Sequence, residues 1–412
     1  MALGIYISVP FCRTKCSYCN FASDVFSRAV FERYVDRVCA DIGNASLFAA
    51  EAGGLLEREV DSIYLGGGTP TVLDPRQLQR IFDAVRGQFQ VQPEAEITVE
   101  CAPGTLSPQV LDTLLRCGVN RVSLGVQSFV DGEAAAVGRL HKRATVLEDI
   151  ARLREAGITN LNVDLIAGLP HQTAESWQRS LDETIATGVL HVSVYMLEVD
   201  EDSRLGRELI AGGTRYHAHS VPDEEATADF YLAACKQLEA AGIAQYEISN
   251  FARAGFESRH NLKYWTRQPY LGFGVDAHSM LPSVSPETGA VRFATPDSLE
   301  HYVAGAELRR TEVSTAAALE ESFFLGLRLN RGVDLRSIAA SFGQDALKNV
   351  WPAIEELTAA GLLQEHDSFV RLTARGRLLS NEVFQRFLAP ASPVSAPTRP
   401  GAVPSSYFSP LP

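Results

Sequence analysis

Three cysteines lie within eight residues near the N-terminus, in the stretch FCRTKCSYCNF at positions 11–21. Cys12, Cys16 and Cys19 have the spacing C-x3-C-x2-C and follow a β-branched run that is typical of a strand. Thiolates select soft metals, meaning zinc, copper(I) or iron–sulfur clusters. Structural zinc needs a fourth cysteine or histidine at a similarly short spacing, and none precedes Cys39. The pattern therefore favours an iron–sulfur cluster that leaves one iron open.

An open iron can hold a small molecule that the cluster reduces by one electron. The amino and carboxylate groups of S-adenosylmethionine can chelate such an iron, where electron transfer cleaves a carbon–sulfur bond and yields a deoxyadenosyl radical. The motif CRTKCSYC, with Tyr18 before its last cysteine, resembles that of the radical S-adenosylmethionine (radical SAM) superfamily. The resemblance implies a partial (β/α)6 barrel, a 4Fe-4S cluster on the three cysteines and an exchangeable S-adenosylmethionine.

The first 200 residues alternate between short β-branched runs and longer segments of helical period. Strands are predicted at 5–9, 62–66, 97–101, 121–127, 160–168 and 191–199. Leucine, isoleucine or valine at three- and four-residue spacing predicts helices at 76–88, 108–117, 144–156 and 174–187. Such repetition demands parallel strands with right-handed crossovers, so the fold class is α/β. The pattern alone does not separate an open doubly wound sheet from a full or partial barrel.

Further motifs resemble the oxygen-independent coproporphyrinogen-oxidase-like family within that superfamily. They are YLGGGTPT (64–71), VECAPGT (99–105), RVSLGVQSF (121–129), GRLH (138–141), NVDLIAGLPHQT (162–173) and ESRHNLKYWTRQPYLGFGVDAHS (257–279). The resemblance carries cofactor contacts onto Tyr6, Tyr18, Gly67, Gly68, Thr69, Glu100, Gln127, Arg139 and Asp164. Several of these residues fall at the ends of predicted strands, where a salt-bridged strand end is the alternative interpretation. Ala102 stands where the family usually has asparagine, which puts one polar contact in doubt.

Two features favour the heme chaperone branch of this family over the branch that oxidatively decarboxylates coproporphyrinogen III. Phe21 occupies the position of a fourth cysteine that is typical of the decarboxylating branch. The run HNLKYW (260–265) matches an H-N-x-x-Y pattern, which implies a tentative heme site at His260, Asn261 and Tyr264. The alternative is that His260 and Tyr264 are satisfied polar groups of the core. Heme and a heme-acceptor protein such as a respiratory enzyme are the implied partners, and coproporphyrinogen III dehydrogenase, an enzyme, is the alternative function.

Four segments are expected along the chain. They are a radical SAM partial barrel at 1–245, an aromatic and histidine-rich segment closing the barrel at 246–302, a mainly helical, winged-helix-like domain at 303–388, and a disordered tail at 389–412. The winged-helix-like domain has roughly balanced charges, so a packing or lid role is favoured over DNA binding, which a cluster-bearing redox regulator would need. His217 and His219 are interpreted as loop histidines rather than a metal pair.

The bulk composition points to a cytoplasmic protein. The chain of 412 residues carries a formal net charge of −13, which disfavours nucleic acid as a partner. No apolar run is long enough to span a bilayer and no signal peptide is recognisable, so only a transient membrane association is compatible with the sequence. Three of the seven cysteines are bunched and the other four are scattered, which is unlike a secreted disulfide scaffold.

Overall fold

The computed structural model describes residues 1–285 and 288–388, so the expected disordered tail at 389–412 lies outside the described residues. Its main sheet has twelve strands in the order β12-β11-β10-β9-β1-β2-β3-β4-β5-β6-β8-β7. The six central strands are parallel and consecutive in the chain: β1 (Leu3–Val9), β2 (Glu59–Gly67), β3 (Gln90–Cys101), β4 (Arg121–Gln127), β5 (Asn160–Ala167) and β6 (His191–Met196). Because β1 and β6 pair with other strands and not with each other, the barrel is partial, as predicted.

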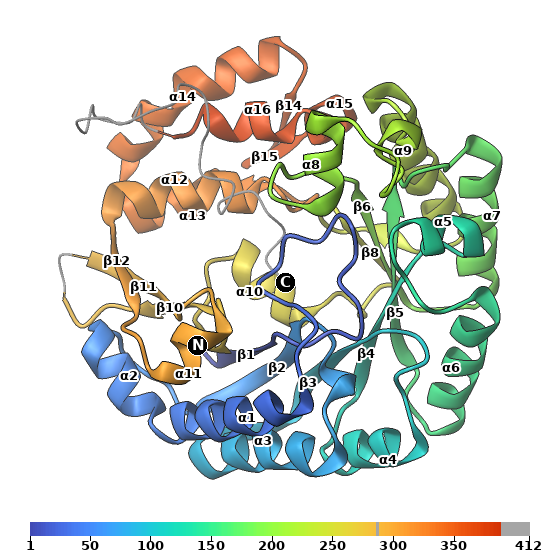
Figure 1. Cartoon of the computed structure of the whole chain (residues 1–412). Helices are drawn as coiled ribbons and strands as arrows, with labels where there is room; N and C mark the ends of the chain where they lie inside the picture. Colours follow the sequence, from blue (N-terminus) through green and yellow to red (C-terminus); the bar gives the residue numbers. More distant parts are fainter. Residues whose placement is uncertain (286–287, 389–412) are drawn as a thin grey trace.

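Helices surround the outside of this sheet (Figure 1). They are α1 (Arg28–Gly43), α2 (Ala45–Ala52), η1 (Pro70–Val72), α3 (Pro75–Gln88), α4 (Pro108–Arg116), α5 (Asp131–Ala136), α6 (Arg143–Glu155) and α7 (Ala174–Ala186). In α3, for example, Asp74 caps the first turn in a capping box with Gln77, and buried residues such as Leu78 and Val85 face the sheet. The four predicted helices are confirmed within one residue or so of their ends.

Strand periodicity makes the two faces of the barrel chemically different. Outward residues such as Ile5, Leu65 and Val163 belong to the large apolar core beneath the helices. The alternate residues point inward and are mostly polar, for example Ser123 of β4 and Asn162 of β5, which hydrogen bond to each other at 2.7 Å. The inner face of the barrel is therefore a mostly polar surface that can line a cavity, whereas the outer face packs into an apolar core.

Further helices and strands follow the six parallel strands, and the strands among them extend both edges of the barrel sheet. They are α8 (Arg204–Ala211), η2 (Ala218–Ser220), α9 (Glu224–Ala240), β7 (Ala244–Gln245), β8 (Asn250–Ala252), α10 (Arg259–Trp265), β9 (Tyr270–Gly274), β10 (His278–Pro282), β11 (Thr288–Ala294), α11 (Leu299–Ala304) and β12 (Arg309–Ser314). Strand β9 runs parallel to β1, whereas β10 to β12 are antiparallel. Helix α10 is drawn inside the curve of the sheet in Figure 1, and its Lys263 pairs with Asp61 near the start of β2 at 2.8 Å. The helix thus lies at the end of the barrel where the strands begin.

The C-terminal region has the element order of a winged-helix module. It comprises α12 (Thr315–Gly326), β13 (Val333–Asp334), α13 (Leu335–Phe342), α14 (Gln344–Ala359), β14 (Leu363–His366), β15 (Phe369–Leu372), α15 (Ala374–Leu378) and α16 (Ser380–Gln385). Its three strands form a small antiparallel sheet in the order β13-β15-β14. A second apolar core joins this region to Tyr264, Trp265 and Tyr270 of the preceding segment. The boundaries at 245, 302 and 388 remain predictions, and α11 spans the junction expected at 302.

Candidate functional site

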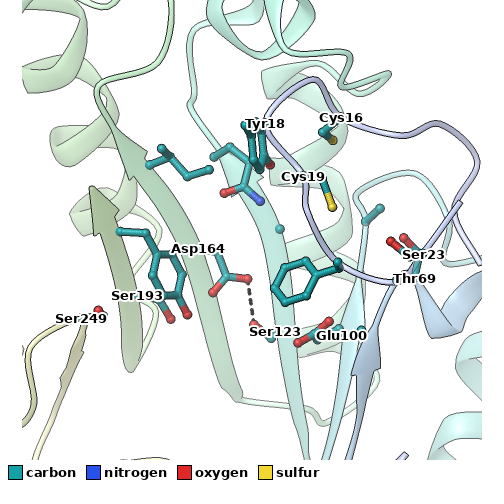
Figure 2. Close-up of a pocket in the computed structure, with 18 of the residues that line it drawn as sticks. Cys16, Tyr18, Cys19, Ser23, Thr69, Glu100, Ser123, Asp164, Ser193 and Ser249 are labelled. Carbon is teal, nitrogen blue, oxygen red and sulfur yellow. Dashed lines mark hydrogen bonds between the residues drawn. The ribbon is translucent and has the colours of Figure 1, made fainter. Parts of the chain in front are cut away.

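A cavity of about 400 Å³ opens at the carboxyl ends of the parallel strands, and Cys12, Cys16 and Cys19 line it. Figure 2 shows Cys16, Tyr18 and Cys19 on the loop after β1, across the cavity from Glu100 and Asp164. Within the described ranges, no three histidine, cysteine or carboxylate side chains converge enough to hold a single metal ion. A cubane cluster makes a different demand, because each thiolate binds a different iron and the sulfurs stand apart. The three thiols therefore suit a cluster better than mononuclear zinc.

The loop that carries the cysteines is fixed by backbone contacts with its neighbours. Thr69 N donates to Phe11 O at 2.8 Å, Cys12 N donates to Asp24 O at 3.0 Å, and Ser17 N donates to Val137 O at 3.1 Å. Lys15 Nζ closes the loop by donating to the carbonyls of Phe21 and Ser23. These hydrogen bonds restrain the loop that carries the three thiols, and such restraint limits the entropy lost when a ligand is bound there.

Two side chains donate hydrogen bonds to the sulfurs. Arg139 Nη1 lies 3.7 Å from Cys16 Sγ, and Thr69 Oγ1 lies 3.8 Å from Cys12 Sγ. Burial raises the pKa of the Cys12 and Cys19 thiols, so thiolates here need compensating positive charge. Arg139 supplies one such charge, and the irons of a cluster would supply more.

The glycines after β2 let the chain pass close to the cysteine loop. A Cβ at Gly68 would lie 2.7 Å from the carbonyl oxygens of Val9 and Phe11, which excludes any other residue there. Gly67 has φ +93°, a conformation that side chains disfavour. Gly67, Gly68 and Thr69 all line the cavity, so a ligand can contact bare backbone at this wall.

Gln127 at the end of β4 is held in a strained backbone conformation. Its φ is +67°, and the pairing of β4 with β5 shifts register between Gly125 and Gln127. The bulge turns the Gln127 side chain into the cavity, where Oε1 is buried without a hydrogen-bond partner in the described part of the chain. A strained residue with an unsatisfied acceptor indicates a ligand contact, such as a hydroxyl donor.

Two carboxylates face the cavity from adjacent strands. Glu100 accepts a hydrogen bond from Tyr64 Oη at 2.8 Å, and Asp164 accepts from Ser123 Oγ at 2.9 Å, the contact dashed in Figure 2. Burial, followed by repulsion from Asp164, raises the pKa of Glu100 to about 8. Burial also raises the pKa of Asp164. A ligand with a positive charge or several hydroxyl groups would stabilise the charged form of both carboxylates. Within the protein, the charge of Arg121 on the same inner face acts in this direction and lowers both pKa values.

The segment GRLH brings further groups to the rim. Arg139 donates to Gly125 O as well as to the Cys16 sulfur, and His141 Nε2 donates to Val126 O at 3.1 Å. Burial and the charge of Arg139 lower the pKa of His141 to about 4, so this ring is neutral. Every predicted cofactor-contacting residue except Tyr6 lines the cavity. Tyr6 is buried one layer below, with its ring 6.2 Å from that of Tyr64.

The residues predicted near heme lie at the other end of the barrel. His260 is 0% exposed, and its two ring nitrogens contact Ser62 Oγ at 3.0 Å and Tyr264 Oη at 2.9 Å. Asn261 reaches the cavity from below, where its Oδ1 has no partner among the described residues. Contact of these residues with heme stays a prediction, and a bond from His260 to a heme iron would require its ring to give up the hydrogen bond to Ser62 or to Tyr264.

Several cavity residues were not predicted from the sequence. Inner-face polar residues on the strands could have been found by extending the alternation down each strand: Arg121, Ser123, Asn162, Ser193 and Tyr195. Others come from the C-terminal domain and carry no local signal: Arg328, Leu378, Ser380 and Asn381. The guanidinium of Arg328 stacks over the Trp265 ring at 4.4 Å. The C-terminal domain therefore forms part of the cavity wall.

These features fit a 4Fe-4S cluster with S-adenosylmethionine. Three thiols on one hydrogen-bonded loop, glycines that leave no room for side chains, and the unpaired Gln127 Oε1 suit a cluster with a polar nucleotide beside it. When bound, the pair would supply one-electron reductive cleavage of a carbon–sulfur bond. The residues of this chain would bind and orient the cluster and the cofactor and enclose them in the cavity.

The fold and the site define a radical SAM protein, and the comparisons with known proteins agree. Residues 6–184 match the family model described as Radical SAM superfamily, and residues 313–379 match the HemN C-terminal domain. Heme chaperone HemW of Bacillus subtilis is 36% identical over 391 residues, covering 93% of this chain and 98% of its own. HemW of Escherichia coli is 30% identical and covers 94% and 98%. This chain belongs to the HemW family of the radical SAM superfamily.

A solved structure supports the same architecture. Coproporphyrinogen III oxidase (HemN) from Escherichia coli, a radical SAM enzyme, superposes with a TM-score of 0.80 at 25% identity, covering 94% of this chain and 90% of its own. The partial barrel and the C-terminal domain are thus shared with that enzyme. Over the ranges 1–285 and 288–388, no helix is both long and apolar enough to cross a membrane.

Proposed function

We propose that this protein is a heme chaperone, which binds heme and passes it to an acceptor protein such as a respiratory enzyme in the cytoplasm. The observation that carries the proposal is similarity to proteins named heme chaperone HemW along 93% of the chain. The three cysteines and their cavity would hold the 4Fe-4S cluster and S-adenosylmethionine.

Phe21 supports this function over decarboxylation of a porphyrinogen. It lines the cavity mouth two residues after Cys19, where the decarboxylating branch typically has a cysteine, and its side chain is 42% exposed. A large exposed aromatic cannot ligate iron, but it offers apolar surface to a flat ligand. The similarity to HemN shows a shared fold, but Phe21 still provides no thiol at the position of the fourth cysteine.

Titration with hemin tests the proposal. The protein is reconstituted anaerobically with iron and sulfide, and hemin binding is followed by the Soret absorbance. We expect saturable uptake of about one heme per monomer with dissociation constants in or below the micromolar range. Uptake without saturation, or conversion of coproporphyrinogen III to protoporphyrinogen IX by the reduced holoprotein with S-adenosylmethionine, would overturn the assignment.

The position of the heme is a separate question. The motif at 260–265 predicts a contact with His260, Asn261 and Tyr264, and ligation by His260 would require its ring to give up the hydrogen bond to Ser62 or to Tyr264.

A further inference from the structure

One arginine inside the barrel has no counter-ion in contact with it. Arg121, the first residue of β4, is 2% exposed and lines the cavity. Over the ranges 1–285 and 288–388, its guanidinium makes no hydrogen bond and no ion pair, and its Nε is buried without a partner. A buried charge is normally paired, because removing an unpaired charge from water is costly. The position of Arg121 therefore indicates a partner that enters the cavity from outside the chain.

The other basic side chains of the cavity differ from Arg121, because each of them already has an acceptor in the protein. They are Arg13, Lys15, Arg139 and Arg328. The first three donate to backbone carbonyls. Arg328 forms an ion pair with Glu247 at 3.9 Å. Among the arginines and lysines that line the cavity in the described part of the chain, Arg121 alone is left to meet an external anion.

The two carboxylates of the cavity wall do not neutralise Arg121 by direct contact. Glu100 accepts a hydrogen bond from Tyr64 Oη at 2.8 Å. Asp164 accepts from Asn162 Nδ2 at 2.6 Å. Burial, followed by repulsion from Asp164, raises the pKa of Glu100 to about 8, so Glu100 is mostly uncharged at pH 7. Both carboxylates thus take their hydrogen bonds from neutral donors, and the guanidinium keeps its five N–H groups for another acceptor.

Arg121 lies deep in the barrel. Burial, and then the charge of Arg121, lower the pKa of His191 on β6. Burial, the charge of Lys263 and that of Arg121 lower the pKa of His260 on α10. Because these two rings belong to different elements, the guanidinium extends toward the middle of the barrel. Arg121 precedes Gln127 by six positions, which is about 20 Å along the strand, so it lies at the opposite end of the cavity from the strand ends.

We propose that Arg121 binds a carboxylate of the ligand that occupies the lower part of the cavity. A planar guanidinium donates two parallel hydrogen bonds to a carboxylate, and this pairing is stronger in a buried site than in water. Two ligands of the proposed function carry such a group: heme has two propionates, and S-adenosylmethionine has one carboxylate. The carboxylate of S-adenosylmethionine is expected on the open iron beside the cysteine loop, so a heme propionate is the expected partner of Arg121. The inference rests in this respect on the proposed function.

A pair of matched ligands tests the propionate. Arg121→Gln removes the charge, and hemin dimethyl ester carries the same macrocycle with both propionates esterified. We expect Arg121→Gln to bind hemin about tenfold more weakly or worse, and to bind the dimethyl ester with unchanged affinity, when Soret absorbance follows binding to the reconstituted protein. Arg116→Gln is the control for net charge, since the Arg116 side chain is 56% exposed on α4 and lies outside the cavity. It should bind both ligands like the unchanged protein.

The urea denaturation midpoint tests whether the charge is unpaired in the ligand-free protein. Removal of a buried charge that has no partner should leave the midpoint of Arg121→Gln unchanged or move it to higher urea. A midpoint well below that of Arg116→Gln would contradict the premise and assign Arg121 a structural role.

Equilibrium dialysis with S-adenosylmethionine and with its decarboxylated form tests the other source of the carboxylate. If Arg121→Gln weakens binding of the first about tenfold, and leaves binding of the second and of hemin unchanged, Arg121 holds the carboxylate of the cofactor. If Arg121→Gln changes the affinity for none of these ligands, or for the free and the modified forms equally, the inference is overturned and the chaperone function stands. If the unchanged protein takes up no hemin, the proposed function itself fails, and the dialysis still decides whether Arg121 binds a carboxylate.

Discussion

The guanidinium of Arg139 bridges the Cys16 sulfur, 3.7 Å from Nη1, and the backbone carbonyl of Gly125. One side chain therefore joins the cysteine loop after β1 to the bulged end of β4. Gln127, the strained residue with a free acceptor, lies two positions beyond Gly125. A shift of the cysteine loop would therefore be transmitted through Arg139 to the end of β4, where Gln127 lines the cavity.

Replacement of a cluster thiol should abolish the metal site without unfolding the protein. We expect Cys16→Ala to lose the brown absorbance near 400 nm and nearly all bound iron, because two thiolates hold a cubane poorly. Cys39→Ala is the matched control, since Cys39 lies outside the cavity on α1 and burial raises its pKa to about 11, which keeps it a thiol. Iron and sulfide analysis after anaerobic reconstitution measures the difference. Full iron retention in the Cys16 variant would contradict the assignment of this loop.

Gln127 should show a trade between stability and ligand binding. Glycine adopts φ +67° without strain, so Gln127→Gly should leave the stability unchanged or raise it by up to about 1 kcal/mol. The same change removes the free acceptor and should weaken S-adenosylmethionine binding roughly tenfold. Urea denaturation and equilibrium dialysis of the reconstituted protein give the two values. Unchanged cofactor affinity would mean that the strain has no part in binding.

Glu100 should make the stability of the cofactor-free protein depend on pH. Its pKa is about 8 in the folded chain and near 4.5 when unfolded, so between these values the folded state holds the extra proton. Stability should then fall as pH rises from 5 to 8, by at most about 1.4 kcal/mol per pH unit. Glu100→Gln should flatten this slope and be the more stable form at pH 8. Denaturation midpoints of both proteins at pH 5.5 and 8 provide the measurement, and parallel curves would refute it.

The strand ends were predictable because the pattern that forms them is local. The β-branched run 97–101 predicts β3. Glu100 lies near the end of this strand, and the carboxyl ends of parallel strands meet at one edge of the sheet, so its carboxylate was expected at the cavity mouth. The same logic located Asp164 on β5. The strain at Gln127 was not predictable, because a bulge depends on the pairing register of two strands and not on the residues of one.

Contacts between residues that are far apart in the sequence were not predictable from the sequence pattern. Arg328 lines the cavity because the C-terminal domain packs against the segment before it, where Arg328 contacts Glu247, Ile248 and Trp265. The contact of His171 with His217 joins two loops on opposite sides of α7 and β6 in the chain. His260 and Tyr264 are an exception, since their spacing of four residues on a helix is a local signal for a pair that satisfies itself.

A variant of His260 tests the heme contact that the motif at 260–265 predicts. His260→Ala removes a buried ring and leaves Ser62 Oγ and Tyr264 Oη without their partner, so it should cost about 2–4 kcal/mol of stability. Tyr264→Phe is the milder control and should cost about 1 kcal/mol, because only one hydrogen bond is lost. Urea denaturation measures both, and hemin affinity is then determined well below the unfolding transition. If His260 contacts the heme as the motif predicts, the folded His260→Ala protein loses hemin affinity while its cluster stays intact, whereas hemin binding like that of the unchanged protein would contradict the predicted contact.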